Sequence, residues 1–113
     1  MSSRAIEAIG LILDGGNDAD DVLRAVVAEL VQEPSIEWAG VLFLDDGELV
    51  LGPEAGVAGP TRRTSVPVFY ENAVVGELAV DGHAELPFLE RVALLISTHV
   101  LLGWDTGGEV WEP

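Results

Sequence analysis

The stretch that decides the fold is residues 35–52, which read Ser-Ile-Glu-Trp-Ala-Gly-Val-Leu-Phe-Leu-Asp-Asp-Gly-Glu-Leu-Val-Leu-Gly. An Asp-Gly step between two apolar runs is a strong hairpin signal. Residue alternation divides the first run into two mostly apolar faces: Ile36, Trp38, Gly40, Leu42 and Leu44 on one, and Glu37, Ala39, Val41 and Phe43 on the other. The pattern predicts a central strand that is covered, at least in part, on both sides.

Two helices are expected before this hairpin. Apolar residues at helical spacing predict a short helix over residues 4–13, ended by Gly15-Gly16. A wide apolar stripe predicts a second helix over residues 20–32, lying on the core and stopped by Pro34.

A second strand pair and a last helix follow the hairpin. Residues 53–60 are rich in glycine and proline and are expected to form a connection without regular structure. Alternating patterns predict strands over residues 62–70 and 73–81, and Pro67 favours an edge position for the first of them. Residues 81–85 read as a polar loop.

The last helix is expected from Pro87 to about Leu102, with Gly103 as its cap. It carries two apolar stripes, so a second subunit is expected to cover one of them. The tail, residues 103–113, holds Trp104 and Trp111 and is expected to dock on the body of the protein or on a partner.

The composition and charge of the chain make some classes of binding partner unfavourable. The chain has 113 residues, 20 acidic and 5 basic residues, a formal net charge of -15 and no cysteine. We expect one domain, residues 1–113, with a core at about 17–102. The charge makes nucleic acid and anionic membrane surfaces poor partners. It indicates solubility, a salt-rich or GC-rich source, or attraction of a basic partner or a cation. With no signal peptide or spanning segment in the sequence, we expect a cytoplasmic protein.

Taken together, the expected elements resemble a GAF domain. The matching segments are residues 21–30, which form an amphipathic helix, then Trp38-Ala39-Gly40-Val41-Leu42-Phe43-Leu44 and Glu48-Leu49-Val50-Leu51-Gly52-Pro53. Residues 65–68, 73–80 and 88–93 are similar to the last two strands and the closing helix of the family. The resemblance covers about residues 17–102 and implies an α/β (α+β) fold with an antiparallel sheet of four or more strands.

Two departures from the family matter for function. The nearest branch is that of the free methionine-R-sulfoxide reductases, which work through cysteines, and this chain has none. Typical members also carry a long helical segment between the second and the penultimate strand, which walls their ligand pocket. Only residues 53–61 fill that interval here. A roadblock- or profilin-like fold, which has a helix at this place, is a further alternative.

Several residues are candidates for chemistry, each with a simpler alternative. Arg62-Arg63 is the only basic pair and suits an anion or an acidic partner, or is a solvated strand start. His83, between Asp81 and Glu85, fits a metal or a polar loop. His99 is expected to be a buried or interfacial histidine with one hydrogen bond, rather than a general base. We predict no metal site and no cofactor.

We therefore expect a non-catalytic sensory or interaction module that forms a homodimer through its helices. The residues expected at the dimer interface are Ile6, Ile9, Leu13, Leu95 and His99. A small-molecule pocket, where one exists, would be lined by Trp38, Phe43, Arg63, Phe69 and Tyr70. The alternative is an enzyme on the same scaffold that works without cysteine.

Overall fold

The computed structural model describes residues 3–15, 18–59 and 62–109. Its elements are α1 (Ser3–Leu13), α2 (Ala19–Leu30), β1 (Ile36–Asp45), β2 (Glu48–Gly56), β3 (Arg63–Tyr70), β4 (Ala73–Gly82) and α3 (Leu86–Glu109). The strands form one antiparallel sheet in the order β2-β1-β4-β3. The expected α+β class, with an antiparallel sheet, N-terminal helices and a C-terminal helix, is confirmed.

Tight turns close the two hairpins, as the sequence indicates. Asp46 and Gly47, between β1 and β2, both have positive φ, of 53° and 84°. Glu71 and Asn72, between β3 and β4, have φ of 52° and 71°. Two successive positive φ values are the mark of the turn whose twist suits paired strands. Each hairpin is therefore a local unit, and the β1–β4 pairing joins the two.

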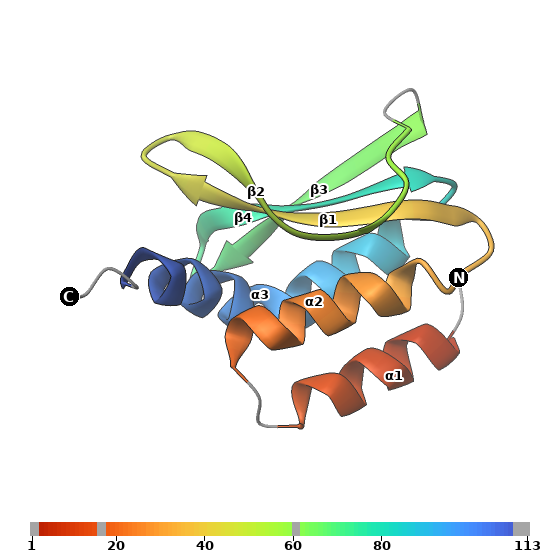
Figure 1. Cartoon of the computed structure of the whole chain (residues 1–113), viewed down its shortest axis with the longest axis horizontal. Coiled ribbons are helices and arrows are strands. Elements are labelled where there is room, and N and C mark those ends of the chain that lie inside the picture. The colour runs from red at the N-terminus through yellow and green to blue at the C-terminus, as the bar shows by residue number, and fades with distance from the viewer. Residues whose placement is uncertain (1–2, 16–17, 60–61, 110–113) are drawn as a thin grey trace.

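All three helices lie on one face of the sheet, which we call the inner face (Figure 1). α2 and α3 pack on the strands, and α1 packs mainly on α2. The core between the layers takes Ala39, Val41 and Phe43 from β1, while Trp38 is buried on the opposite, outer face. The prediction that this strand is partly covered on both sides is confirmed. Ile36 belongs to the core, not to the face of Trp38, because the register shifts between them.

Three expected boundaries are wrong. β2 does not stop at Gly52 but continues through Pro53 to Gly56, because an irregularity between the Gly40 and Leu42 pairings accommodates the extra residue. β4 ends at Gly82, one residue beyond the expected end at Asp81, so Gly82 belongs to the strand and not to the polar loop. Gly103 does not end α3, which continues to Glu109. One glycine costs a helix only about 1 kcal/mol, too little to stop it.

The helical extension changes the interpretation of the tail. Trp104 falls within α3, whereas Trp111 lies outside the described residues, and the expected docking of the tail stays a prediction. The two apolar stripes of α3 are covered within one chain, because α3 packs on both β3 and α2. These stripes therefore do not require a second subunit.

Candidate functional site

Each of the four strands contributes one side chain to a cluster on the outer face. Trp38 and Arg63 both lie opposite Asp81 in the strand register, and Gly40, two residues after Trp38, lies opposite Glu54. Because side chains of every second residue share a face, the register brings these groups together. We call this set, Trp38, Glu54, Arg63 and Asp81, the outer cluster.

The ion pair between Arg63 and Asp81 forms the inner part of the outer cluster. The guanidinium donates from Nε to Oδ1 at 2.7 Å and from Nη2 to Oδ2 at 2.9 Å. The Gly59 N–H also donates to Oδ2, at 2.6 Å. The Asp81 side chain has no accessible surface, whereas that of Arg63 is 37% exposed. Asp81 thus has the partners that a buried carboxylate needs.

This geometry shifts the pKa values of both Asp81 and Arg63. The hydrogen bonds from Arg63 hold the pKa of Asp81 below its ordinary value, and the Gly59 N–H and the positive charge of Arg63 act in the same direction against the effect of burial. The hydrogen bond to Asp81 raises the pKa of Arg63 in turn. Both groups are therefore charged at neutral pH.

Trp38 forms the outer part of the cluster. The Arg63 guanidinium carbon lies 4.3 Å from the centre of the indole ring, a cation–π distance. The indole Nε1–H donates to Oε1 of Glu54 at 2.8 Å. The ring also lies over Gly40, where a Cβ atom would come within 2.6 Å of it. A glycine is needed under the indole, which covers this part of the sheet.

The outer cluster has the properties of a structural clamp. Asp81 is buried and its two oxygens accept three hydrogen bonds, so its carboxylate is poorly placed to accept a proton from a substrate. Nε and Nη2 of Arg63 are committed to this carboxylate. The cluster links β1, β2, β3 and β4 with the connection at Gly59.

The five residues expected at a ligand pocket do not converge. Trp38 and Arg63 meet in the outer cluster, but Phe43 lies in the core on the inner face, with its ring against Gly52. Phe69 is exposed and Tyr70 half-buried at the far end of β3.

The five residues expected at a dimer interface are largely used inside the chain. Ile9 is fully buried, and Ile6, Leu13 and Leu95 are partly buried against the core. His99 is half-buried, and its Nδ1 is buried without a hydrogen-bond partner among the described residues. The one hydrogen bond expected of His99 is therefore not made by this nitrogen.

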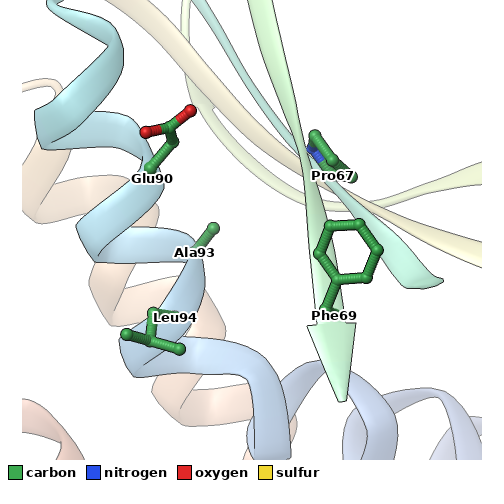
Figure 2. Close-up of a pocket in the computed structure, with 5 residues that line it drawn as sticks. All are labelled: Pro67, Phe69, Glu90, Ala93 and Leu94. Atoms are coloured by element: carbon green, nitrogen blue, oxygen red, sulfur yellow. The ribbon is translucent and has the colours of Figure 1, made fainter. Parts of the chain in front are cut away.

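An apolar groove lies between the edge strand β3 and α3 (Figure 2). It has a volume of about 220 Å³, and Pro67 and Phe69 on β3 face Glu90, Ala93 and Leu94 on α3 across it. A neighbouring groove shares Glu90 and Leu94 and extends along α3 to Pro87, Arg91 and Leu95. Leu94 is 74% exposed and Phe69 51%. Large apolar side chains thus remain accessible at this surface.

The remaining polar candidates give no assembled site. Among residues 3–15, 18–59 and 62–109, no group of histidine and carboxylate side chains is arranged to hold a metal ion. Arg62 forms an exposed ion pair with Glu37 at 3.6 Å. No helix in the described part of the chain is long and apolar enough to cross a membrane.

Sequence reasoning missed Asp81 and Glu54 as members of the outer cluster. The available signal for Asp81 was its position after the apolar run Leu78-Ala79-Val80, on the same strand face as Ala79. No signal for Glu54 was available, because residues 53–60 did not read as a strand.

Comparison with known proteins gives structural relatives only. No family model matches the sequence, and no curated protein matches it. The GAF domain of a phosphoenolpyruvate-protein phosphotransferase from Coxiella burnetii has a TM-score of 0.76 at 13% identity, over 93% of this chain and 95% of that one. Its counterpart from Acinetobacter has a TM-score of 0.70 at 15% identity, over 96% and 99%.

An enzyme is found among the similar structures as well. The free methionine-R-sulfoxide reductase from Neisseria meningitidis, in complex with its substrate, has a TM-score of 0.71 at 15% identity. The match covers 94% of this chain and 95% of that one. At such identities the likeness concerns the fold and not the activity.

Proposed function

We propose that this chain, whose fold is that of GAF domains, is a non-catalytic interaction module that forms a homodimer through the surface between β3 and α3. The observation that carries the proposal is a contrast between two surfaces. Polar groups of the outer cluster are paired with one another, whereas Phe69 and Leu94 leave large apolar side chains exposed. Exposed apolar surface beside a groove is typical of association.

Three features argue against an enzyme. The sulfoxide reductases of this fold, as the resemblance implies, act through cysteines, and the chain has none. Asp81 is buried and paired, so it is not available as a general base. Trp38 covers the outer face of the sheet at Gly40. A small-molecule sensor would have to move this indole first.

The proposed interface, which we call the α3 face, consists of Pro67, Phe69, Ala93 and Leu94. Burying a large apolar side chain contributes at most about 1.5–3 kcal/mol, and the Phe69 and Leu94 pairs of two copies would supply four such chains. Association itself costs about 4–15 kcal/mol. The gain and the cost are of the same order, so we expect a weak dimer whose population depends on the protein concentration.

Charge is compatible with self-association at the α3 face. Each copy carries a formal charge of -15, which opposes any dimer. At the α3 face, Arg91 lies beside Glu90 along the second groove, so this surface carries both signs. Pro67 has no N–H to offer, which makes strand-to-strand pairing along the β3 edge less favourable than helix contact.

The matched pair Leu94→Glu and Leu11→Glu tests this function. Both leucines are 74% exposed, one on α3 and the other on α1. Sedimentation equilibrium should show a concentration-dependent dimer for the wild type and for Leu11→Glu, and a monomer for Leu94→Glu. A wild-type monomer at all concentrations would contradict the proposal, and dissociation by Leu11→Glu alone would move the interface to α1.

Native mass spectrometry of the freshly purified protein tests whether it is a dimer and whether it retains a small ligand. We expect a dimer whose mass is twice that of the chain. An added small mass would indicate a retained ligand and would favour a sensory role with the indole of Trp38 displaced.

A further inference from the structure

A second apolar surface lies on the outer face, at the closed end of the β1–β2 hairpin. Leu44 pairs with Leu49 and Leu42 pairs with Leu51 in the strand register, and alternation places the four side chains on the outer face. Leu49 and Leu51 are 41% and 46% exposed, and Leu42 and Leu44 are half-buried. We call these four residues the leucine patch.

The leucine patch is continuous with the outer cluster but is not covered by it. A Cβ atom at Gly40 would meet both the indole of Trp38 and, at 3.3 Å, Cδ1 of Leu51. The indole therefore reaches the edge of the leucine patch and ends there. All helices of the described chain lie on the inner face (Figure 1), so no helix of the same chain covers these leucines.

Carboxylates surround the leucine patch. Asp46 lies in the turn, Glu77 lies opposite Leu42, and Glu54, which accepts the hydrogen bond from Trp38, lies opposite Gly40. Among the described residues, none of these three takes part in an ion pair. Arg63 is the cation of the outer cluster, and its charge is matched by Asp81. The rim of the leucine patch is thus uniformly negative.

We propose that the leucine patch and its acidic rim bind a basic amphipathic helix of another protein. The leucines would contact the apolar stripe of that helix, and the carboxylates would pair with lysine or arginine side chains at its borders. Residues two apart on one strand are about 6.5–7 Å apart, close to the ~5–6 Å between side chains three or four apart on a helix. Leu49 and Leu51 therefore match successive apolar turns of one helix.

A second copy of this chain is the less favourable occupant. Face-to-face contact of two leucine patches would bring the bordering carboxylates of both copies together, and like charges at an interface oppose binding. The α3 face, at the β3 edge of the sheet, is the surface proposed for self-association. The two proposals thus concern different surfaces and different partners.

The probe is a synthetic peptide of about 18 residues, five helical turns, made of leucine and lysine with the leucines on one helical face. A second peptide carries glutamate in place of lysine. Binding of the full-length protein to each fluorescein-labelled peptide is measured by anisotropy at about 0.15 M salt, where remote charges are screened. We expect the lysine peptide to bind at least about tenfold more tightly than the glutamate peptide.

Two matched pairs of variants locate the contact. The double variant L49S/L51S should bind the lysine peptide about tenfold more weakly than the wild type, whereas L11S should change binding less than about twofold. D46N with E77Q should weaken it about fivefold, whereas E7Q with D14N, which removes the same charge elsewhere, should leave it nearly unchanged. Amide NMR shifts of the wild type should move around residues 42–51 and 77, and not around residues 86–94.

The same measurements can overturn the proposal. Equal weakening by both acid-to-amide pairs, with no effect of L49S and L51S, would show attraction by net charge alone. Equal binding of both peptides would show that the acidic rim has no role. A change of oligomeric state in L49S with L51S would assign the leucine patch to a second copy. None of these outcomes depends on whether Leu94→Glu dissociates the dimer.

Discussion

Arg63 donates to both carboxylate oxygens of Asp81, a side chain with no accessible surface, across neighbouring strands β3 and β4. The next residue back along the chain, Arg62, forms its ion pair with Glu37 at 3.6 Å, and both partners are more than half exposed. Two adjacent arginines thus make one buried and one exposed ion pair. Their comparison separates the energetic effect of burial from that of charge.

Replacing Arg63 by methionine should destabilise the fold far more than replacing Arg62. Without Arg63 the buried carboxylate of Asp81 loses its charged partner, which is strongly destabilising, whereas Arg62 and Glu37 are both exposed. Arg62→Met should cost less than about 0.5 kcal/mol. Urea unfolding of the two variants measures the difference, and equal losses would mean that Asp81 is hydrated when Arg63 is absent.

Asp81 should make stability depend on pH at the acid end. Its pKa is lowered in the folded state from an ordinary value near 3.8, so its contribution is present above that value and is lost as pH falls through the lower, folded pKa. Asp81→Asn should therefore be less stable than the wild type at pH 7, and the gap should narrow below about pH 4. Thermal unfolding at several pH values measures the gap; a constant gap would contradict the ion-pair account.

Gly40→Ala and Gly10→Ala should have opposite effects on stability. A Cβ at Gly40 would come within 2.6 Å of the Trp38 ring, whereas at Gly10, inside α1, it meets nothing within 4 Å. The first change should displace the indole and cost about 1–3 kcal/mol. The second should stabilise α1 by about 0.5–1 kcal/mol.

Trp38 fluorescence gives the local readout of that displacement. In a background with Trp104→Phe and Trp111→Phe, the emission of Trp38 should shift to longer wavelength in Gly40→Ala, as the ring becomes more hydrated. An unchanged spectrum together with unchanged stability would show that the sheet moves and the ring does not.

Dimerisation through the α3 face should strengthen with salt. Two chains of formal charge -15 repel each other, and raising the ionic strength from about 0.05 M to 0.5 M shortens the range of that repulsion. Binding of a basic helix to the leucine patch should weaken over the same range. Sedimentation and anisotropy at matched salt concentrations distinguish the two contacts by the sign of their salt dependence.

The order and class of the elements could be predicted because turns and helix ends are local. Asp46-Gly47 and Pro34 act through their own backbone preferences, and both marked real boundaries. The wrong boundaries lie where the chain continues through a residue that usually ends an element: β2 continues through Pro53, and α3 continues through Gly103. In both cases the contacts of the whole element outweigh the local preference of one residue.

The candidate site was predictable only in part. Trp38 and Arg63 were expected among the residues of a ligand pocket, and they do meet. Alternation correctly placed Phe43 on the strand face opposite Trp38, but it did not show which of the two faces bears the helices. Asp81 required the β1–β4 and β3–β4 registers, which join residues far apart in sequence.

The strand order has a consequence for how the chain folds. β1–β2 and β3–β4 are hairpins with tight turns, and hairpins of this kind form within microseconds. The β1–β4 pairing instead joins Ile36 to Gly82 and therefore closes a long loop. We expect docking of the two hairpins to limit the folding rate. Substitutions at the β1–β4 seam, such as Val41→Ala opposite Leu78, should slow folding, whereas substitutions at Leu11 should mainly leave the rate unchanged.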